Sequence, residues 1–198
     1  MDFLTRISER MRHFFDDVPE FTHPTEVIEY LKSWAHDRPS TMGFIGEKDT
    51  LTVQNFTTVV GPVVVGKNVH IGPYCFLRGP LFLDDNVHIG PYSEIVRCVV
   101  SRGSAFYHRN LFLDSVIGEN AKFAGLATCC NASPRGTVNV HYRGQKTEYP
   151  KSFGVTVENN TYAGVNTIFS PGAHMPEGMS VPGPCVVYGH GKVRSMFS

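Results

Sequence analysis

Three side chains of complementary chemistry stand near the middle of this 198-residue chain: Arg78, Glu94 and His108. The arginine lies 30 residues before the histidine and the glutamate 14 residues before it. Histidine titrates near neutral pH, so it can take a proton from an attacking nucleophile. Arginine presents a forked set of donors that fits phosphate, and glutamate accepts hydrogen bonds from hydroxyl or amine groups. These residue types would suit proton transfer beside a bound, anionic substrate.

A six-residue repeat forms the elements that must position these side chains. Every sixth residue of one stretch is a branched aliphatic: Val53, Val59, Val65, Ile71, Leu77, Leu83, Ile89 and Ile95. A second run follows: Val157, Ala163, Phe169, Met175, Val181 and Val187. Helices repeat about every 3.6 residues and strands every 2, whereas fixed longer periods are typical of solenoids. The repeat predicts an all-β fold, a parallel β-helix in which each hexad forms one of three flat sides and points its aliphatic residue inward.

Two identical hexapeptides support a coil of three hexads. VHIGPY occurs at 69–74 and again at 87–92, 18 residues later. The copies should therefore stack, with adjacent coils about 4.8 Å apart. We expect His70 and His88 to pack on each other at the surface. Hexapeptide solenoids also host zinc enzymes that use an H-x-x-x-x-H pair, but this chain has no such pair, so no metal site is expected.

The register slips between the two runs. From residue 99 to 130 the inward positions include two that follow a step of five residues, Val100 after Ile95 and Ile117 after Phe112, and such a slip suits a coil that bulges to admit a ligand. The inward candidates here are Val100, Phe106, Phe112, Ile117, Phe123 and Cys129. Residues 131–154 break the repeat, and the alternation over 137–142 before Arg143-Gly144-Gln145 predicts an extruded β-hairpin. Long insertions of this kind are usually functional.

The first 49 residues differ in kind from the rest and predict a helical cap. Apolar residues at helical spacing form two stripes, one over residues 4–15 and one over residues 27–35, and Pro24 suits a first helical turn. These helices need an apolar partner, for which we expect the base of the solenoid or a neighbouring subunit. The sequence thus divides into a cap at 1–49 and a β-helix at 50–198.

The amino-acid composition limits the partners and the cellular locations that we expect for the protein. Lys plus Arg and Asp plus Glu balance at 18 each, which argues against nucleic acid or an acidic membrane surface as a partner. No apolar stretch of membrane-spanning length and no signal-like segment is present. The five cysteines are odd in number and lack C-x-x-C spacing, which disfavours a disulfide framework. A cytoplasmic location is expected.

The segment HRNLFLDSVIGENAKFAGLATCCN at 108–131 resembles the β-helix acetyltransferase domain of bifunctional sugar-1-phosphate nucleotidyltransferases. The resemblance extends loosely over 53–188 and implies a left-handed coil, a homotrimer and acetyl-CoA as cosubstrate. It implies His108 as the general base and Asn131 beside the acetyl group. Arg78 and Glu94 would hold the sugar phosphate, with Arg97 and Lys122 at neighbouring positions. Gly125 would supply oxyanion-stabilising N–H groups, and Gly164 belongs to the coils that would carry acetyl-CoA.

Several positions depart from the family pattern. Val96, Leu111 and Ala132 replace a lysine and two tyrosines, and Lys122 replaces an asparagine. The nucleotidyltransferase domain has no counterpart in the 49 residues before the repeat. The leading hypothesis is an acyl-CoA-dependent N-acetyltransferase acting on an amino sugar or sugar phosphate. The alternative is a non-catalytic trimeric scaffold, or a protein that binds a sugar nucleotide or CoA.

Simpler interpretations also stand for each of these side chains. His108 would be a surface histidine at an irregular corner. Arg78 and Glu94 would form an exposed ion pair between coils, worth about 0.5 kcal/mol. Asn131 would cap the turn into the hairpin.

Overall fold

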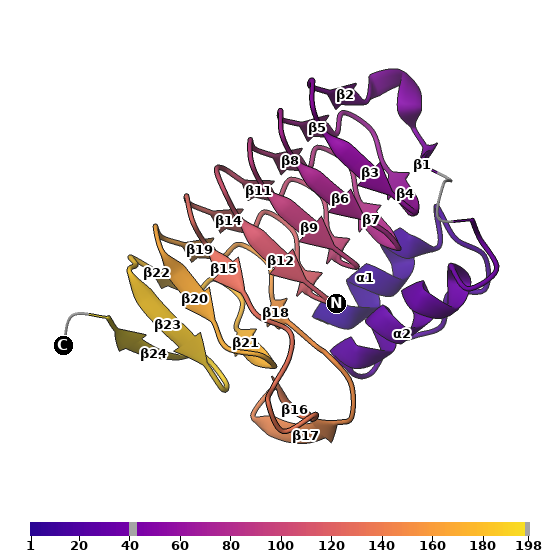
Figure 1. Cartoon of the computed structure of the whole chain (residues 1–198). Helices are drawn as coiled ribbons and strands as arrows, with labels where there is room; N and C mark the ends of the chain where they lie inside the picture. The colour runs from indigo at the N-terminus through magenta and orange to yellow at the C-terminus, as the bar shows by residue number, and fades with distance from the viewer. Residues whose placement is uncertain (40–42, 197–198) are drawn as a thin grey trace.

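Three parallel sheets form the walls of one solenoid in the computed structural model, which describes residues 1–39 and 43–196 (Figure 1). Sheet A consists of β1 (Gly43–Gly46), β4 (Pro62–Val65), β7 (Leu81–Leu83), β10 (Val99–Val100), β13 (Val116–Ile117), β18 (Val155–Val157) and β21 (Ala173–Met175). Sheet B consists of β2 (Thr52–Val53), β5 (His70–Ile71), β8 (His88–Ile89), β11 (Ala105–Phe106), β14 (Lys122–Phe123), β19 (Tyr162–Ala163) and β22 (Ser180–Val181). Sheet C consists of β3 (Thr58–Val60), β6 (Phe76–Arg78), β9 (Glu94–Val96), β12 (Leu111–Leu113), β15 (Thr128–Cys129), β20 (Thr167–Phe169), β23 (Cys185–Tyr188) and the antiparallel β24 (Lys192–Ser195).

The chain visits sheets A, B and C in turn, so a strand of one coil pairs with the strand three elements later. Across the inserted hairpin the pairs are β13 with β18, β14 with β19 and β15 with β20. This confirms the parallel β-helix that the hexads predict. His70 is paired with His88 and Ile71 with Ile89, so the two VHIGPY copies stack as expected. The histidine rings lie 4.9 Å apart and nearly parallel. The left-handed sense of the coil stays a prediction of the family resemblance.

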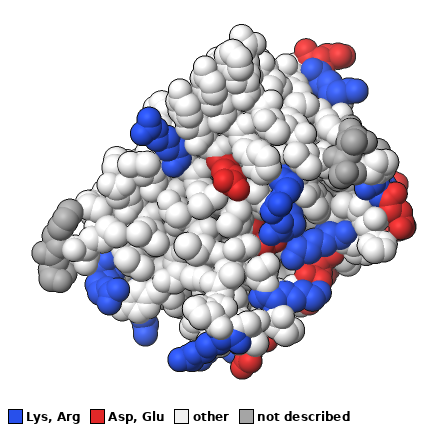
Figure 2. Space-filling model, viewed as in Figure 1, with Lys and Arg blue, Asp and Glu red and all other residues white. Residues whose placement is uncertain are grey.

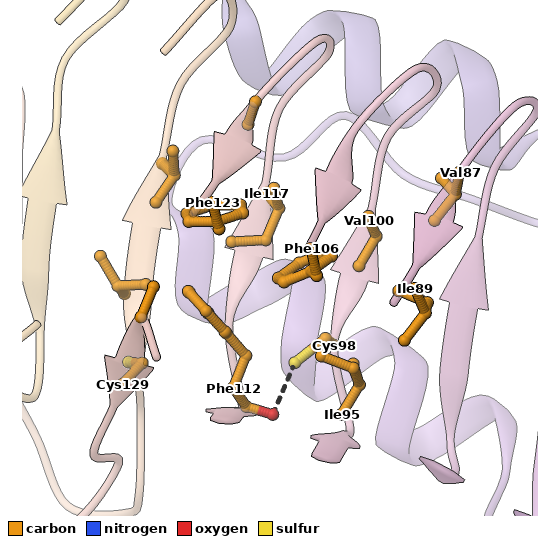
Figure 3. Packing of buried hydrophobic residues seen from close by; sticks show 14 of the residues in the cluster. Val87, Ile89, Ile95, Cys98, Val100, Phe106, Phe112, Ile117, Phe123 and Cys129 are labelled. Atoms are coloured by element: carbon orange, nitrogen blue, oxygen red, sulfur yellow. Dashed lines mark hydrogen bonds between the residues drawn. The ribbon is translucent and has the colours of Figure 1, made fainter. Parts of the chain in front are cut away.

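The predicted inward residues line a continuous apolar core (Figure 3). Aliphatic side chains fill its first coils, and phenylalanines take over where the register slips. Phe112 packs on Phe106 and Phe123 with ring centroids 5.0 and 4.6 Å apart. Val53 departs from the prediction and is 39% exposed. It lies on the terminal strand β2, and no further coil of the described chain covers that end.

The N-terminal helices cover a side of the solenoid. Helices α1 (Phe3–Met11) and α2 (Pro24–Trp34) share a buried cluster with the outer side chains of sheet A, among them Val64, Phe82 and Val116. Figure 1 shows both helices alongside this wall. The expectation that they cover the base is therefore corrected. The outer face of sheet A is itself apolar, and this is the surface the helices bury.

A hairpin of β16 (Val138–Tyr142) and β17 (Gln145–Tyr149) confirms the strand and turn predicted for the insertion. The expected extrusion is only partial, because one face of the hairpin packs against the rest of the protein. Val138, Val140 and Tyr142 alternate with polar residues and are buried in the same cluster as the helices.

The short 3-10 helix η1 (Lys48–Thr50) precedes the first strand of sheet B. No helix in the described ranges is long and apolar enough to cross a bilayer.

Candidate functional site

His108 lies at the corner between sheets B and C, which we call the B–C corner. It follows β11 by two residues, and its side chain is exposed. The backbone N–H of Leu126 donates to the His108 carbonyl at 2.9 Å, which places the next coil directly beside it. A Cβ added to Gly125 would lie 3.7 Å from the His108 oxygen and 3.9 Å from its Cβ. The structure therefore brings together two predicted site residues, His108 and Gly125.

Glu94 and Arg78 share the outer face of sheet C, one coil apart. Glu94 is paired with Phe76 on one side and Leu111 on the other, and Arg78 is paired with Val96. Both charged side chains are exposed. Within the described residues neither takes part in an ion pair, so the simple ion-pair interpretation is not supported. Figure 2 shows this face as largely uncharged, with one isolated acidic side chain in its middle and basic side chains to either side.

Lys122 lies on the adjoining wall, sheet B, two coils beyond His88. Its Nζ donates to the carbonyl of Gly103. The pKa of His88 is lowered, first by burial and then by the positive charges of His70, His108 and Lys122. His88 thus lies close to His70, His108 and Lys122 at the edge of the B–C corner. The sequence analysis gave His88 only a role in stacking at the surface. The hexad register nevertheless places it one coil before the corner that holds His108.

Arg97 and Asn131 lie at a different corner, between sheets C and A. Arg97 donates from Nε and Nη2 to the buried Asp114 at 2.7 and 2.8 Å, and Asn131 Nδ2 donates to Asp114 at 2.5 Å. Ser152 Oγ donates to the same carboxylate at 3.0 Å, and Lys32 Nζ lies 3.5 Å from it. In the described structure the side chains of both predicted residues are therefore hydrogen-bonded to Asp114 within the same chain. Asn131 opens the hairpin insertion, and its role as a turn cap stays a prediction.

Burial works to raise the pKa of Asp114, but the hydrogen bonds from Arg97 and Asn131 and the positive charges of Arg97 and Lys32 outweigh it and lower that pKa. Arg97 in turn has a raised pKa, chiefly because of its hydrogen bond to Asp114. Sequence reasoning missed Asp114 altogether. The sequence did hold a signal for it: the hexad register places Asp114 one coil after Arg97 at the same corner, so the acidic and the basic side chain are expected to be neighbours.

Gly164 is buried between coils. A Cβ there would lie 2.0 Å from the carbonyl oxygen of Pro182, so no side chain fits without a shift of the backbone. This close approach explains the glycine through packing alone.

A hollow of about 520 Å³ opens on sheet C one coil beyond His108. Its lining is mostly apolar: Leu126, Thr128, Asn166, Ile168, Pro184 and Met196. Leu126 contributes both to this hollow and to the hydrogen bond with the His108 backbone. We call it the apolar hollow. It could hold a flexible, partly apolar chain with one end beside an exposed imidazole.

An exposed ladder of side chains runs down the same corner. Phe56 stacks on Tyr74 and Tyr74 on Tyr92, each pair with ring centroids 5.0 Å apart, and the Arg109 guanidinium lies 5.6 Å from the Tyr92 ring centroid. Tyr92 is 54% exposed. Exposed aromatic side chains that form a contiguous row are typical of interaction sites.

Comparisons with solved structures find sugar-modifying enzymes of low similarity. A variant of perosamine N-acetyltransferase from Caulobacter crescentus, in complex with CoA and GDP-perosamine, is 12% identical with a TM-score of 0.26. That match covers 77% of this chain and 57% of the other chain. The polySia-specific acetyltransferase NeuO is 14% identical over 77% of this chain and 84% of its own, with a TM-score of 0.32. The polysialic acid O-acetyltransferase OatWY is 15% identical over 77% and 87%, with a TM-score of 0.30.

At these values the similarity carries no inference about substrate or mechanism. No protein-family model matches the sequence, and no curated protein does.

Proposed function

We propose that the protein transfers an acyl group from acyl-CoA, with acetyl-CoA as the expected donor, to an amino sugar or sugar phosphate. The observation that carries the proposal is the placement of an exposed histidine, His108, beside the apolar hollow. The pantetheine arm of the donor would lie in that hollow, and its thioester would reach His108. The family resemblance of residues 108–131 supports the same assignment.

In the proposed reaction the acceptor nitrogen forms a bond to the acyl carbonyl carbon, and the carbon–sulfur bond breaks. An ammonium cannot attack a thioester, so His108 takes the proton from the attacking amine. The thiolate of CoA leaves and takes up a proton. Backbone N–H groups near Gly125 would stabilise the negative charge that develops on the carbonyl oxygen.

The acceptor would lie against sheet C. Arg78 would bind an anionic group of the sugar, and Glu94 would accept from its hydroxyl or amine groups. Lys122 lies on sheet B and would approach only the part of the acceptor that crosses the corner. Arg97 and Asn131 have no direct role in the proposed reaction, because both side chains are hydrogen-bonded to Asp114.

A homotrimer would complete the site. His108, Glu94 and Arg78 lie on open walls of a single chain, and a recess around them would need a second wall. The exposed ladder at the B–C corner supports a neighbouring subunit in that position. Sedimentation or light scattering would measure the assembly directly, and a monomer at assay concentration would contradict this part of the proposal.

The deciding experiment is an acetyl-transfer assay over a panel of amino sugars and amino sugar phosphates, with release of free CoA as the readout. Wild type and His108→Ala should differ by about 10²- to 10⁴-fold. His70→Ala, which removes a stacked histidine outside the corner, should retain wild-type turnover. Equal background turnover in all three proteins would remove the catalytic assignment.

One observation favours a second candidate, a non-catalytic protein that binds CoA or a sugar nucleotide. Two of the residues predicted for the site, Arg97 and Asn131, serve an internal ion-pair network. Thermal stabilisation by CoA without turnover in the assay above would support this candidate. The absence of any response to CoA or sugar nucleotides would leave a scaffold role.

A further inference from the structure

A second hollow, of about 790 Å³, lies where the hairpin meets the C-terminal strands β23 and β24. We call it the basic hollow. Its polar lining includes Arg135, His141, Lys146, Glu148, Tyr188 and Lys192. It opens at the corner between sheets C and A, whereas His108 lies at the B–C corner.

The basic hollow carries uncompensated positive charge. Within the described chain, Arg135, Lys146 and Lys192 take part in no ion pair. Glu148 is the one carboxylate of its lining, so three cations against one anion leave a net charge of +2. The whole chain has a formal net charge of zero. A local excess of this kind in a concave surface attracts anions.

The side chains converge on one glycine of the rim. Lys146 stands directly opposite His141 in the hairpin register. A Cβ added to Gly189 would lie 3.9 Å from His141 Cε1 and 3.9 Å from Lys192 Cδ. The pKa of His141 is lowered, first by burial and then by the charges of Lys146, His190, Lys192 and His174. The hairpin and the C-terminal turn thus place cations of distant sequence around a common space.

A buried hydrogen-bonded chain leads to the same turn. Glu158 Oε1 lies 3.0 Å from Nε2 of His174, and Nδ1 of His174 lies 2.6 Å from Nδ1 of His190. Glu158 and His174 are buried, whereas His190, which follows Gly189, is exposed. Burial works to raise the pKa of Glu158, but its hydrogen bond with His174 and nearby positive charges lower it. The ionised Glu158 therefore accepts from Nε2–H of His174. The hydrogen-bonded chain ends at the exposed ring of His190, one residue after Gly189 of the rim.

We propose that the basic hollow binds a small phosphorylated molecule. Lys146, Lys192 and Arg135 neutralise the phosphate, and the ring of His141 lines the same space. A phosphate dianion matches the net charge of the lining, and the volume lies within the range of about 300–1,000 Å³ typical of small-molecule sites. Glu148 and Tyr188 remain to contact uncharged polar groups of the same molecule. The proposal is independent of acyl transfer at His108.

Calorimetric titration of the full chain tests the proposal with inorganic phosphate, glucose 1-phosphate and UMP, beside glucose and uridine as uncharged counterparts. The phosphorylated probes should bind, and comparison among them identifies whether the phosphate comes from a sugar, a nucleotide or the free ion. Replacing Lys146→Gln and Lys192→Gln together should weaken binding by at least about tenfold, because charge-assisted hydrogen bonds are lost. The matched control is Lys48→Gln with Lys67→Gln, two exposed lysines of the first coils, which should bind as wild type does.

Two results would overturn the proposal. One is equal affinity for the phosphorylated probe in wild type, the Lys146/Lys192 variant and the control. The other is equal affinity for a phosphorylated probe and its uncharged counterpart. Thermal melting of each variant shows that the comparison is made between folded proteins. The ring resonances of His141, which lines the hollow, should move during an NMR titration only with the phosphorylated probes.

Discussion

Arg97 and Asp114 stand on successive coils, and two hydrogen bonds of 2.7 and 2.8 Å join the guanidinium to the fully buried carboxylate. Asn131 and Ser152, which flank the hairpin, donate to the same group, and Lys32 of helix α2 lies 3.5 Å away. One carboxylate therefore joins the solenoid, both ends of the insertion and the N-terminal helices. This is a structural role for residues that sequence reasoning placed near substrate.

Asp114→Asn should destabilise the fold by about 3 kcal/mol at pH 7, since it leaves Arg97 without its charged partner. The folded pKa of Asp114 is lowered, so its stabilisation is present above the unfolded value of about 3.9 and is lost as pH falls below that value. Chemical denaturation at pH 7 and near pH 3 should show a smaller difference between variant and wild type in acid. A difference that stays constant with pH would contradict the ionised network.

Two glycines predicted to bind cofactor should respond differently to alanine. Gly164→Ala would force a Cβ to within 2.0 Å of the Pro182 oxygen, whereas the Cβ of Gly125→Ala meets its nearest atom at 3.7 Å. We expect a marked loss of stability for the first, of about 1–3 kcal/mol, and little change for the second. Thermal melting checks this. Equal melting temperatures for the two variants would show that coil spacing at Gly164 is not tight.

The aromatic cluster of the middle coils should carry much of the stability of the core. Phe112 is fully buried and contacts the rings of Phe106, Phe123 and Phe169. Phe112→Ala should cost about 3–5 kcal/mol through lost burial and a residual cavity. Leu111→Ala, on the outer face of the same strand, is the matched control and should cost less. Urea denaturation of both variants measures the difference.

The hexad repeat predicted the solenoid because its periodicity is a local property: Ile71, Ile89 and Phe106 point inward wherever the coil continues. It also aligned His70 with His88, since both belong to the same hexad position. The repeat could not show which outer wall is covered. That depends on helices and a hairpin whose partner, the apolar outer face of sheet A, is recognised only once all three walls are assembled.

The candidate site was predictable to a similar degree. His108 and Gly125 are 17 residues apart, close to one coil, and their adjacency follows from the register. The contacts of Arg97 do not follow from it, because they depend on Asp114 at the same corner of the next coil and on Lys32 from a helix far away in sequence. Likewise, Glu158, His174 and His190 belong to separate coils, and no local pattern marks them as a group.

The last prediction concerns proton placement at His190. Its pKa is lowered by burial and by the positive charge of His174, and the negative charge of Glu158 partly offsets this. Glu158→Gln retains an oxygen that can accept from His174 but removes the charge, so the pKa of His190 should fall further. The positive charge of His174 and the burial of His190 stay unchanged in the variant and act in the same direction in both proteins.

NMR titration of the His190 ring between about pH 4 and 8 measures this shift. Glu47→Gln, in the first coil, is the control and should leave the titration of His190 as in wild type. Because a lowered histidine pKa makes protonation oppose folding, stability should fall as pH drops through about 6.5, and more steeply in Glu158→Gln. An unchanged or higher His190 pKa in that variant would show that the carboxylate does not act through His174.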